Sequence, residues 1–302
     1  MAAGKMHADE LDIDEALVRR LLAARFPEWA GLPIERFPSA GTVNALFRLG
    51  EDMSVRLPRI PGGVEDVEKE HRWISRLAPH LPVPVPVVLG KGTPTEEYPW
   101  PWSVHRWLDG ENPTPETLTD PVALAGDLAA FITALQAIDT DGGPRAARTR
   151  PLVTQDEECR HALAELDGLV DVPAATAAWE ATLEAPNWSA PPVWVHADLM
   201  PGNLLTSGGR LSAVIDFATT GIGDPACDMI VAWYLLPAHA REAFRAELGV
   251  DDATWTRGRG WALSMALIQL PYYKDTNPSI AAQARHVIGE VLAERTHDLS
   301  AS

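Results

Sequence analysis

Apolar and polar positions follow two different periods along the chain, and these periods divide it into a front and a back part. Short apolar runs interrupted by glycine, proline and aspartate predict strands joined by turns over residues 34–59 and 85–108. Apolar positions three and four residues apart predict amphipathic helices. These helical patterns cover residues 10–25, 64–78, 121–138 and most of the chain after residue 216. A strand-rich front and a helix-rich back predict a two-lobed α+β protein that divides near residues 105–110.

Two polar insertions interrupt apolar segments in the middle of the chain. The first lies in VWVHADLMPGNLL, residues 193–205, where Asp198 and Asn203 stand between two apolar runs. The second lies in LSAVIDF, residues 211–217, where Asp216 has apolar neighbours. Burying a carboxylate is costly unless it is paired or bound to a metal ion. Taken alone, the first insertion is also typical of a polar turn without a function, because Asp and Asn bond to nearby backbone groups.

The segment between the two insertions predicts that they lie side by side. Its sequence, TSGGRL, contains two consecutive glycines, which are a turn signal between two short strands. A hairpin at this point would bring Asp198, Asn203 and Asp216 together. Oxygen ligands of this kind suit Mg²⁺, which usually keeps water molecules and substrate phosphates in its shell. We therefore expect Asn203 and Asp216 to bind Mg²⁺, and Asp198 to remain free to accept a proton.

The same residues carry a resemblance to known kinases. HADLMPGN followed by IDF resembles the kinase catalytic loop H-R-D-L-x-x-x-N and the later D-F-G, with Ala197 in place of the arginine and Ala218 in place of the glycine. The loop is closer to the H-G-D-L-x-x-x-N of the aminoglycoside phosphotransferase family of small-molecule kinases. The following GIGDPACDMIVAW also resembles that family's G-D-P-x-x-D stretch. The resemblance covers roughly residues 35–290 and is strongest over residues 193–233.

The resemblance implies a protein-kinase-like fold. We expect an N-terminal β-sheet lobe with one key helix, which binds the nucleotide and comprises residues 1–108. We expect a larger C-terminal helical lobe over residues 109–302, which carries the catalytic and substrate-binding groups. The hinge between the lobes is expected at about residues 105–110.

Several features of the front lobe are candidates for contact with the nucleotide phosphates. Gly41 and Thr42 lie in a turn that could cover the phosphates, although an ordinary hairpin turn is equally typical of this stretch. Kinases carry a lysine on the next strand, paired with a helix glutamate. Here Arg56 takes that place, and arginine binds phosphate through a planar, always charged fork; an edge-strand arginine without a ligand is the alternative. Glu70 lies on the apolar stripe of residues 64–78, so we expect it to pair with Arg56.

The adenine is expected at the connector between the lobes, residues 103–111. The resemblance implies that backbone groups read the base at this point. The candidates are His105, Arg106 and Leu108. No cluster of cysteine or histidine surrounds His105 in the sequence, so a metal-binding role is not expected for it.

Other polar residues of the back part are expected to be structural. Asp228 precedes an apolar helix and suits a cap, and the resemblance implies that an acid here bonds the catalytic loop. Asp224 is expected to form a turn, with contact to substrate as an alternative. His196 is expected to be a fixed scaffold residue. A solvated helix N-terminus accounts for the acids at residues 156–158, although contact with a substrate amine is the alternative.

Composition limits the partners of the protein. The chain has 302 residues and a net charge of −17, which argues against nucleic acid and anionic membranes as partners because both require a basic surface. The charge suits a cationic acceptor, and simple solubility also explains it. No apolar run reaches the roughly 18 residues that span a membrane. Two cysteines do not form a disulfide framework, so a reducing cytoplasm is the expected location.

Together these features predict an ATP- and Mg²⁺-dependent kinase, with GTP as the alternative nucleotide. Asp198 is expected to orient and deprotonate a hydroxyl of a small molecule. The expected acceptor is an aminoglycoside or a similar amine-bearing antibiotic. Two alternatives remain open: a kinase of a housekeeping metabolite such as choline, homoserine or a sugar, and a catalytically silent nucleotide-binding pseudokinase.

Overall fold

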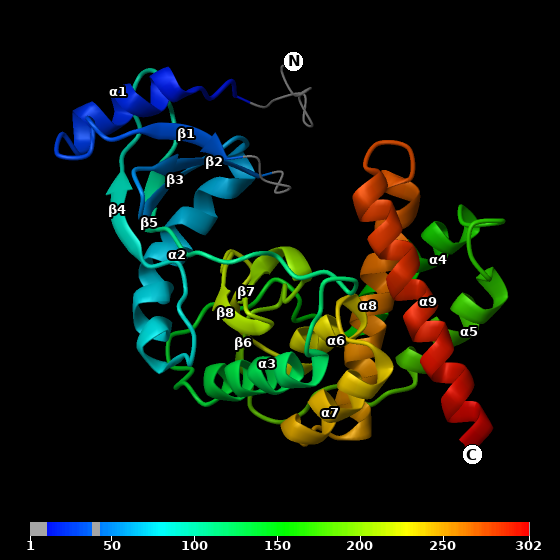
Figure 1. Ribbon diagram of the computed structural model, residues 1–302. Coiled ribbons are helices and arrows are strands. Elements are labelled where there is room, and N and C mark those ends of the chain that lie inside the picture. Colours follow the sequence, from blue (N-terminus) through cyan, green and yellow to red (C-terminus); the bar gives the residue numbers. More distant parts are fainter. Residues whose placement is uncertain (1–10, 38–42, 302) are drawn as a thin grey trace. The chain divides into compact units, whose positions relative to one another are not determined.

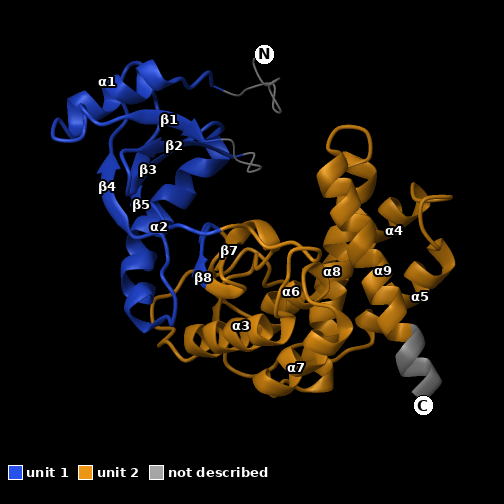
Figure 2. Ribbon diagram, in the orientation of Figure 1, with its two compact units in different colours: residues 1–110, 212–218 blue, residues 111–211, 219–302 orange. Residues whose placement is uncertain are grey.

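The computed structural model describes residues 11–37 and 43–301, with side chains up to residue 295 (Figure 1). The chain forms two compact units (Figure 2). Unit 1 comprises residues 1–110 and 212–218, and unit 2 comprises residues 111–211 and 219–302. The sequence predicted a single division at about residue 108. The compact units differ from that division because the short segment that contains Asp216 packs with the front part of the chain.

Unit 1 is built around a five-stranded antiparallel sheet with the strand order β1-β2-β3-β5-β4. Its strands are β1 (Ile34–Phe37), β2 (Asn44–Leu49), β3 (Met53–Pro58), β4 (Val88–Gly92) and β5 (Trp102–Arg106). Its helices are α1 (Glu15–Arg25) and α2 (Val64–Leu77), with short 3₁₀ turns at Pro61–Gly63 and Ala78–His80. The strands and helices predicted for the front part of the chain are therefore present.

The core of unit 1 determines which side chains of the sheet are buried and which can still contact a ligand. Along β2 every second residue is buried, as expected of a strand with one covered face, and Phe47 lies in the core with Leu22 of α1. In β3 all residues are buried except Arg56, which is only partly covered. Arg56 is therefore the one charged side chain of β3, and solvent reaches it in part. Helix α2 contacts the other two strands on this side of the sheet, β4 and β5.

Unit 2 is mainly helical. Its helices are α3 (Pro121–Gln136), α4 (Asp156–Ala164), α5 (Val172–Leu183), α6 (Val231–Tyr234), α7 (Ala238–Leu248), α8 (Asp252–Tyr273) and α9 (Pro278–Ala301), with 3₁₀ turns at Leu152–Gln155, Pro201–Asn203 (η4) and Pro225–Ile230 (η5). Its strands are β6 (Val193–Val195), β7 (Leu204–Ser207) and β9 (Gly221–Gly223). Strand β8 (Arg210–Val214) begins in unit 2 and continues into unit 1. None of the described helices combines the length and the apolarity needed to cross a bilayer.

Short strands place the catalytic-loop sequence within unit 2. Strands β7 and β8 pair as the predicted hairpin, and the turn glycines Gly208 and Gly209 have φ angles of 57° and 78°, which suit glycine. Strand β9 pairs antiparallel with β6, so the sequence after Asp216 is not helical throughout as its pattern predicted. A Cβ atom on Gly221 would lie 2.4 Å from the backbone nitrogen of Ala146, so glycine is required where another segment crosses this strand.

Candidate active site

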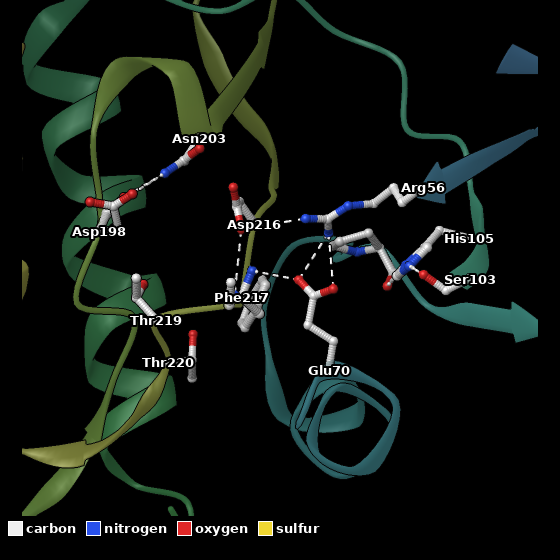
Figure 3. Close-up of polar contacts among 12 residues, drawn as sticks. Arg56, Glu70, Ser103, His105, Asp198, Asn203, Asp216, Phe217, Thr219 and Thr220 are labelled. Atoms are coloured by element: carbon white, nitrogen blue, oxygen red, sulfur yellow. Dashed lines mark hydrogen bonds and ion pairs between the residues drawn. The ribbon is translucent and has the colours of Figure 1, made fainter. Parts of the chain in front are cut away.

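Unit 1 contains a buried ion pair between strand β3 and helix α2 (Figure 3). The Nη1 of Arg56 donates to Oε1 and Oε2 of Glu70 at 2.9 and 3.0 Å. The side chains are 14% and 3% exposed, so the pair is largely shielded from water. Burial lowers the pKa of Arg56, but the nearby carboxylates of Glu70 and Asp216 outweigh burial and raise it above its ordinary value. The pairing that periodicity predicted for Glu70 is thus present.

The segment after β8 meets this ion pair. The backbone N–H of Phe217 donates to Oε1 of Glu70 at 3.2 Å, and the Nη2 of Arg56 lies 3.6 Å from Oδ1 of Asp216 (Figure 3). Lys69 of the same helix donates to the backbone oxygen of Ala218 at 2.7 Å. Helix α2 therefore holds residues 216–218 from two positions. The sequence did not indicate the role of Lys69, because its partner is a backbone oxygen distant along the chain.

Asp216 has the conformation and the charge surroundings of a cation ligand. Its φ angle of 63° lies in the left-handed region, which aspartate tolerates better than most residues. Its side chain is 45% exposed, so a ligand can reach the carboxylate. The cations of Arg56 and Lys69 lie near three carboxylates, those of Asp66, Glu70 and Asp216, so this cluster carries excess negative charge. A bound cation would balance that excess.

In unit 2 the catalytic-loop sequence follows strand β6 and ends in η4. The Nδ2 of Asn203 donates to the backbone oxygen of Asp198 at 2.8 Å and to its Oδ2 at 2.9 Å (Figure 3). Because these bonds use the amide nitrogen, the amide oxygen of Asn203 points away from Asp198. This oxygen could therefore bind a cation. The Asp198 side chain is 20% exposed. The structure thus brings Asp198 and Asn203 together, as their spacing predicted.

The loop backbone is fixed by a buried carboxylate. Asp228, in η5, accepts hydrogen bonds from the backbone N–H groups of His196 at 2.9 Å and Ala197 at 2.7 Å. Burial raises the pKa of Asp228 to about 7, although the two N–H donors favour its ionised form. The hydroxyl of Thr219 donates to the backbone oxygen of His196 at 2.8 Å. These contacts fit the structural role expected of Asp228.

Ala197 adopts a strained backbone conformation within this clamp. Its φ angle is 63°, and its side chain is fully buried. The left-handed region costs a residue with a Cβ roughly 1–2 kcal/mol, and glycine avoids this cost. The loops that this sequence resembles have glycine at the same place. The hydrogen bond from the Ala197 N–H to Asp228 therefore holds a conformation that the local sequence disfavours.

An arginine that the sequence interpretation missed contacts Asp198 directly. The Nη1 of Arg148 lies 2.9 Å from Oδ1 of Asp198 and also donates to the backbone oxygen of Ala197. Both carboxylate oxygens of Asp198 are therefore held, one by Arg148 and the other by Asn203. The available signal was the run GGPRAARTRP, residues 142–151, in which three arginines occur without an acidic residue.

The structure describes some, but not all, of the other residues predicted to contact the nucleotide. Gly41 and Thr42 lie outside the described residues. The ring of His105 is buried, with Nδ1 3.1 Å from the Pro86 oxygen and Nε2 2.7 Å from the Ser103 hydroxyl, so only its backbone remains a candidate for contact with the base. The Arg106 side chain is exposed, and its backbone N–H donates to the Val87 oxygen at 2.9 Å; Leu108 is half-buried.

The acids expected to be structural have partners within unit 2. Asp224 binds Arg257 through two hydrogen bonds of 2.7 and 3.1 Å and caps η5 by accepting from the Ala226 N–H at 2.9 Å. At the start of α4, Asp156 accepts from the indole N–H of Trp179 at 2.9 Å and pairs with an arginine one turn later. These two carboxylates are therefore engaged.

The protein supplies only some of the ligands that a magnesium ion requires. Among the described residues, no group of three or more histidine, cysteine, aspartate or glutamate side chains has a metal-binding arrangement. Magnesium is commonly held by one or two protein ligands together with water and phosphate oxygens. The outward amide oxygen of Asn203 and the exposed carboxylate of Asp216 each suit that requirement.

Comparisons with known proteins agree with this reading of the residues. The profile of the phosphotransferase enzyme family matches residues 34–261. Comparison with curated protein sequences gave no match. Among solved structures, the GDP complex of wild-type aminoglycoside 2'-phosphotransferase-IIIa has a TM-score of 0.73 and 17% identity, covering 94% of this chain and 100% of that chain.

Two further solved structures show the range of proteins with this fold. The GDP and kanamycin complex of APH(2")-IIia has a TM-score of 0.71 and 19% identity, covering 92% of this chain and 98% of that chain. The apoenzyme of macrolide 2'-phosphotransferase MphH from Brachybacterium faecium has a TM-score of 0.59 and 22% identity, covering 91% and 98%. At these identities the similarity is one of fold, and the predicted kinase-like α+β fold is confirmed.

Proposed function

We propose, because the chain belongs to the phosphotransferase enzyme family, that this small-molecule kinase transfers the γ-phosphate of ATP to a hydroxyl group in a Mg²⁺-dependent reaction. The observation that carries the proposal is the fixed carboxylate of Asp198. One of its oxygens is held by Asn203 and the other by Arg148, and Asp228 clamps the backbone before it. Phosphoryl transfer depends mainly on positioning and charge neutralisation, and this loop supplies a positioned base.

Asp198 is proposed as the residue that accepts the proton of the acceptor hydroxyl. The acceptor oxygen forms a bond to the γ-phosphorus, the bond from that phosphorus to the β–γ bridging oxygen breaks, and ADP leaves. The hydroxyl proton moves to the Asp198 carboxylate. A positioned base of this kind contributes typically 10²–10⁴-fold to the rate.

Arg56 is proposed to contact the nucleotide phosphates, with Glu70 orienting its guanidinium. The support is the buried pair and the partial exposure of Arg56 on an otherwise covered strand. Asn203 and Asp216 would hold Mg²⁺, which neutralises charge on the phosphates when bound. That these two residues share one ion is an inference from their order in the sequence motif.

The remaining nucleotide contacts are proposals from the sequence. The turn at Gly41 and Thr42 would cover the phosphates, and backbone groups near His105, Arg106 and Leu108 would meet the base. Structures with this fold were solved with GDP or with ADP, so both ATP and GTP are candidates. The proposed location is the reducing cytoplasm, which suits two buried free cysteines.

The acceptor class remains open within this proposal. An amine-bearing antibiotic such as an aminoglycoside was expected from the resemblance and from the net charge of −17. Proteins of the same fold include a kanamycin complex and a macrolide phosphotransferase, so the fold serves acceptors of different chemistry. Residues of this chain must therefore decide the acceptor.

The experiment is an assay of ADP and GDP release from Mg·ATP and Mg·GTP with an acceptor panel. The panel contains aminoglycosides, macrolides, choline, homoserine, sugars and hydroxylated acids. Acceptor-stimulated release that requires Mg²⁺ and is lost in Asp198→Asn supports the proposal. Nucleotide binding without stimulated release by any compound would favour the pseudokinase alternative.

A further inference from the structure

Unit 2 contains a cavity of about 300 Å³ whose lining includes three arginines. Its lining includes Arg145, Arg150, Trp188, Ile222, Asp224 and Arg257. Residues of strand β9 and of the segment that crosses it are among the lining residues. The cavity lies wholly within unit 2, so its charge follows from side chains of that unit alone.

Only one carboxylate lies among the lining residues that the structure describes, and it is already engaged. Asp224 binds Arg257 through two hydrogen bonds and also caps η5. Arg257 donates further to the Pro186 oxygen at 2.7 Å and is 6% exposed. This pair is therefore a neutral, fixed part of the wall, and a substrate amine would find no available carboxylate on it.

Two arginines of the wall retain their charge for a ligand. Arg145 and Arg150 are exposed, and in the described part of the chain their side chains make no hydrogen bond or ion pair. With Asp224 and Arg257 cancelling each other, the cavity carries a net positive charge from these two side chains. An arginine fork binds carboxylate or phosphate groups through two parallel hydrogen bonds.

The cavity is connected to the proposed base through backbone structure. Ile222 and Gly223 of β9 line it, and β9 pairs with β6, the strand that leads into the loop of Asp198. The other link is the segment 145–150, whose two ends line the cavity while Arg148 between them pairs with Asp198. A molecule in this cavity would therefore contact Thr149 and Arg150, the residues that follow Arg148, the ion-pair partner of Asp198.

The wall also offers an aromatic surface. Trp188 lies with the Arg257 guanidinium 5.7 Å from its ring centroid, and Trp261 is a further lining residue. A cavity lined by two indole rings and by the cations of Arg145 and Arg150 suits an acceptor with an apolar or planar body and a separate anionic group. A polycationic molecule would instead be repelled by Arg145 and Arg150.

We infer that the acceptor of this kinase carries an anionic group, a carboxylate or a phosphate or sulfate ester, which Arg145 and Arg150 bind while its hydroxyl reaches Asp198. The inference rests on the proposed function and opposes the amine-bearing acceptor expected from the family resemblance and the net charge. The overall charge acts at long range and is screened over about 8 Å at physiological ionic strength, whereas the cavity arginines act in contact.

The test compares two double variants that remove the same charge. Arg145→Gln with Arg150→Gln changes the cavity, and Arg72→Gln with Arg285→Gln changes two other exposed arginines outside it. Calorimetric titration in the presence of Mg·ADP, at constant ionic strength, measures binding of 4-hydroxyphenylacetate, its neutral amide, a 4-hydroxyphenyl sulfate and kanamycin. ADP release from Mg·ATP with the same compounds is measured in parallel.

We expect the anionic probes to bind the wild type and the control more tightly than the amide does. The cavity variant should bind the anionic probes about tenfold or more weakly than the wild type does, because each lost contact involves a charged partner. The control variant should keep the basal ATP hydrolysis and the KM for Mg·ATP of the wild type. The difference in affinity between 4-hydroxyphenylacetate and 4-hydroxyphenyl sulfate identifies the preferred anion.

Kanamycin binding tighter than that of the acids, or equal anion binding by both double variants, would overturn the inference. Absence of anion binding to the wild type would overturn it as well. These outcomes differ from failure of the proposed function. In that case Mg·ATP would not be turned over with any compound, while the arginine-dependent difference in anion binding would still be measured.

Discussion

Arg148 and Asp198 form an ion pair in which Nη1 of the arginine lies 2.9 Å from Oδ1 of the aspartate. The side chains are 23% and 20% exposed, so the pair is partly shielded from solvent. The second carboxylate oxygen of Asp198 accepts from Asn203. Two partners from different segments thus fix the orientation of the proposed base, and Arg148 is a positioning residue in this arrangement.

Arg148→Gln is expected to lower kcat by up to about 10²-fold, because a small displacement of a reacting group can cost that much. The KM for Mg·ATP should change little. Arg148→Lys should restore part of kcat, since an ammonium group keeps the charge but not the fork. Steady-state kinetics of the three proteins provide the measurement. A fall in thermal stability with unchanged kcat would instead indicate a purely structural arginine.

Asp198→Asn is expected to lower kcat by about 10²–10⁴-fold while leaving nucleotide affinity nearly intact. The amide keeps the size of the side chain and can still accept from Asn203, but it cannot take the hydroxyl proton. Fixed-time assays of phosphorylated product measure kcat, and titration with Mg·ADP measures nucleotide affinity. Near-normal turnover would remove Asp198 from the mechanism.

Asp216→Asn is expected to abolish the Mg²⁺ dependence of ATP binding. Asparagine tolerates the left-handed conformation at φ 63°, so this variant removes the charge with less backbone strain than alanine would introduce. ATP affinity is titrated with Mg²⁺ and with EDTA for the wild type and the variant. A variant that still gains affinity on addition of Mg²⁺ would show that the metal site lies elsewhere.

Arg56→Lys should be tolerated better than Arg56→Met, because the proposed requirement is a cation that pairs with Glu70. Arg56→Met leaves the Glu70 carboxylate, 3% exposed, without its charged partner. Removing one partner of a buried pair costs about 3–5 kcal/mol of stability. Denaturant unfolding and the KM for Mg·ATP are measured for both variants.

The double variant Arg56→Met with Glu70→Gln separates stability from function at this pair. It removes the uncompensated charge, so its stability should recover toward that of the wild type. Its KM for Mg·ATP should stay high. Equal activity of the lysine and methionine variants would contradict a phosphate-binding role for Arg56.

The stability of unit 1 is expected to fall in acid through His105. Burial lowers the pKa of His105 to about 3, from an ordinary value of 6.5. The folded state therefore binds fewer protons than the unfolded state between these values. The contribution of neutral His105 is present above about pH 6.5 and is lost as the pH falls toward 3, by roughly 5 kcal/mol in total.

Denaturant unfolding of the wild type and His105→Gln between pH 7 and pH 4 measures this contribution. The wild type should lose stability relative to the variant as the pH falls. Asp228 acts in the opposite direction over this range, because its pKa is raised to about 7 and its contribution is lost as the pH rises. That contribution is common to both proteins and cancels in their difference. Parallel pH profiles would contradict the assignment.

Periodicity and motif spacing were sufficient for the helices and strands of the front part of the chain and for two side-chain pairs of the candidate site. The stripe of α2 placed Glu70 opposite Arg56, and the five-residue spacing within HADLMPGN placed Asn203 next to Asp198. Both relations are set by one helix face or one short loop. They follow from local geometry, which the sequence encodes directly.

Contacts between segments far apart in the chain were not visible in the same way. Lys69 binds a backbone oxygen 149 residues away, and Arg148 meets Asp198, which lies far from it along the chain. Neither partner shares a period or a motif with the other. The short strand β9 also escaped prediction, because three residues carry too little pattern.

The sequence by itself determined the kinase-like fold, the family and the candidate residues Arg56, Glu70, Asp198, Asn203 and Asp216, because these depend on periodic burial and on a motif of fixed spacing. The tertiary structure decided the electrostatic surroundings. It paired Arg148 with the proposed base, neutralised Asp224 with Arg257, and left Arg145 and Arg150 on a cavity wall. Total charge is a sum over the sequence, whereas the charge that a ligand meets depends on which side chains folding has paired and which it has left exposed.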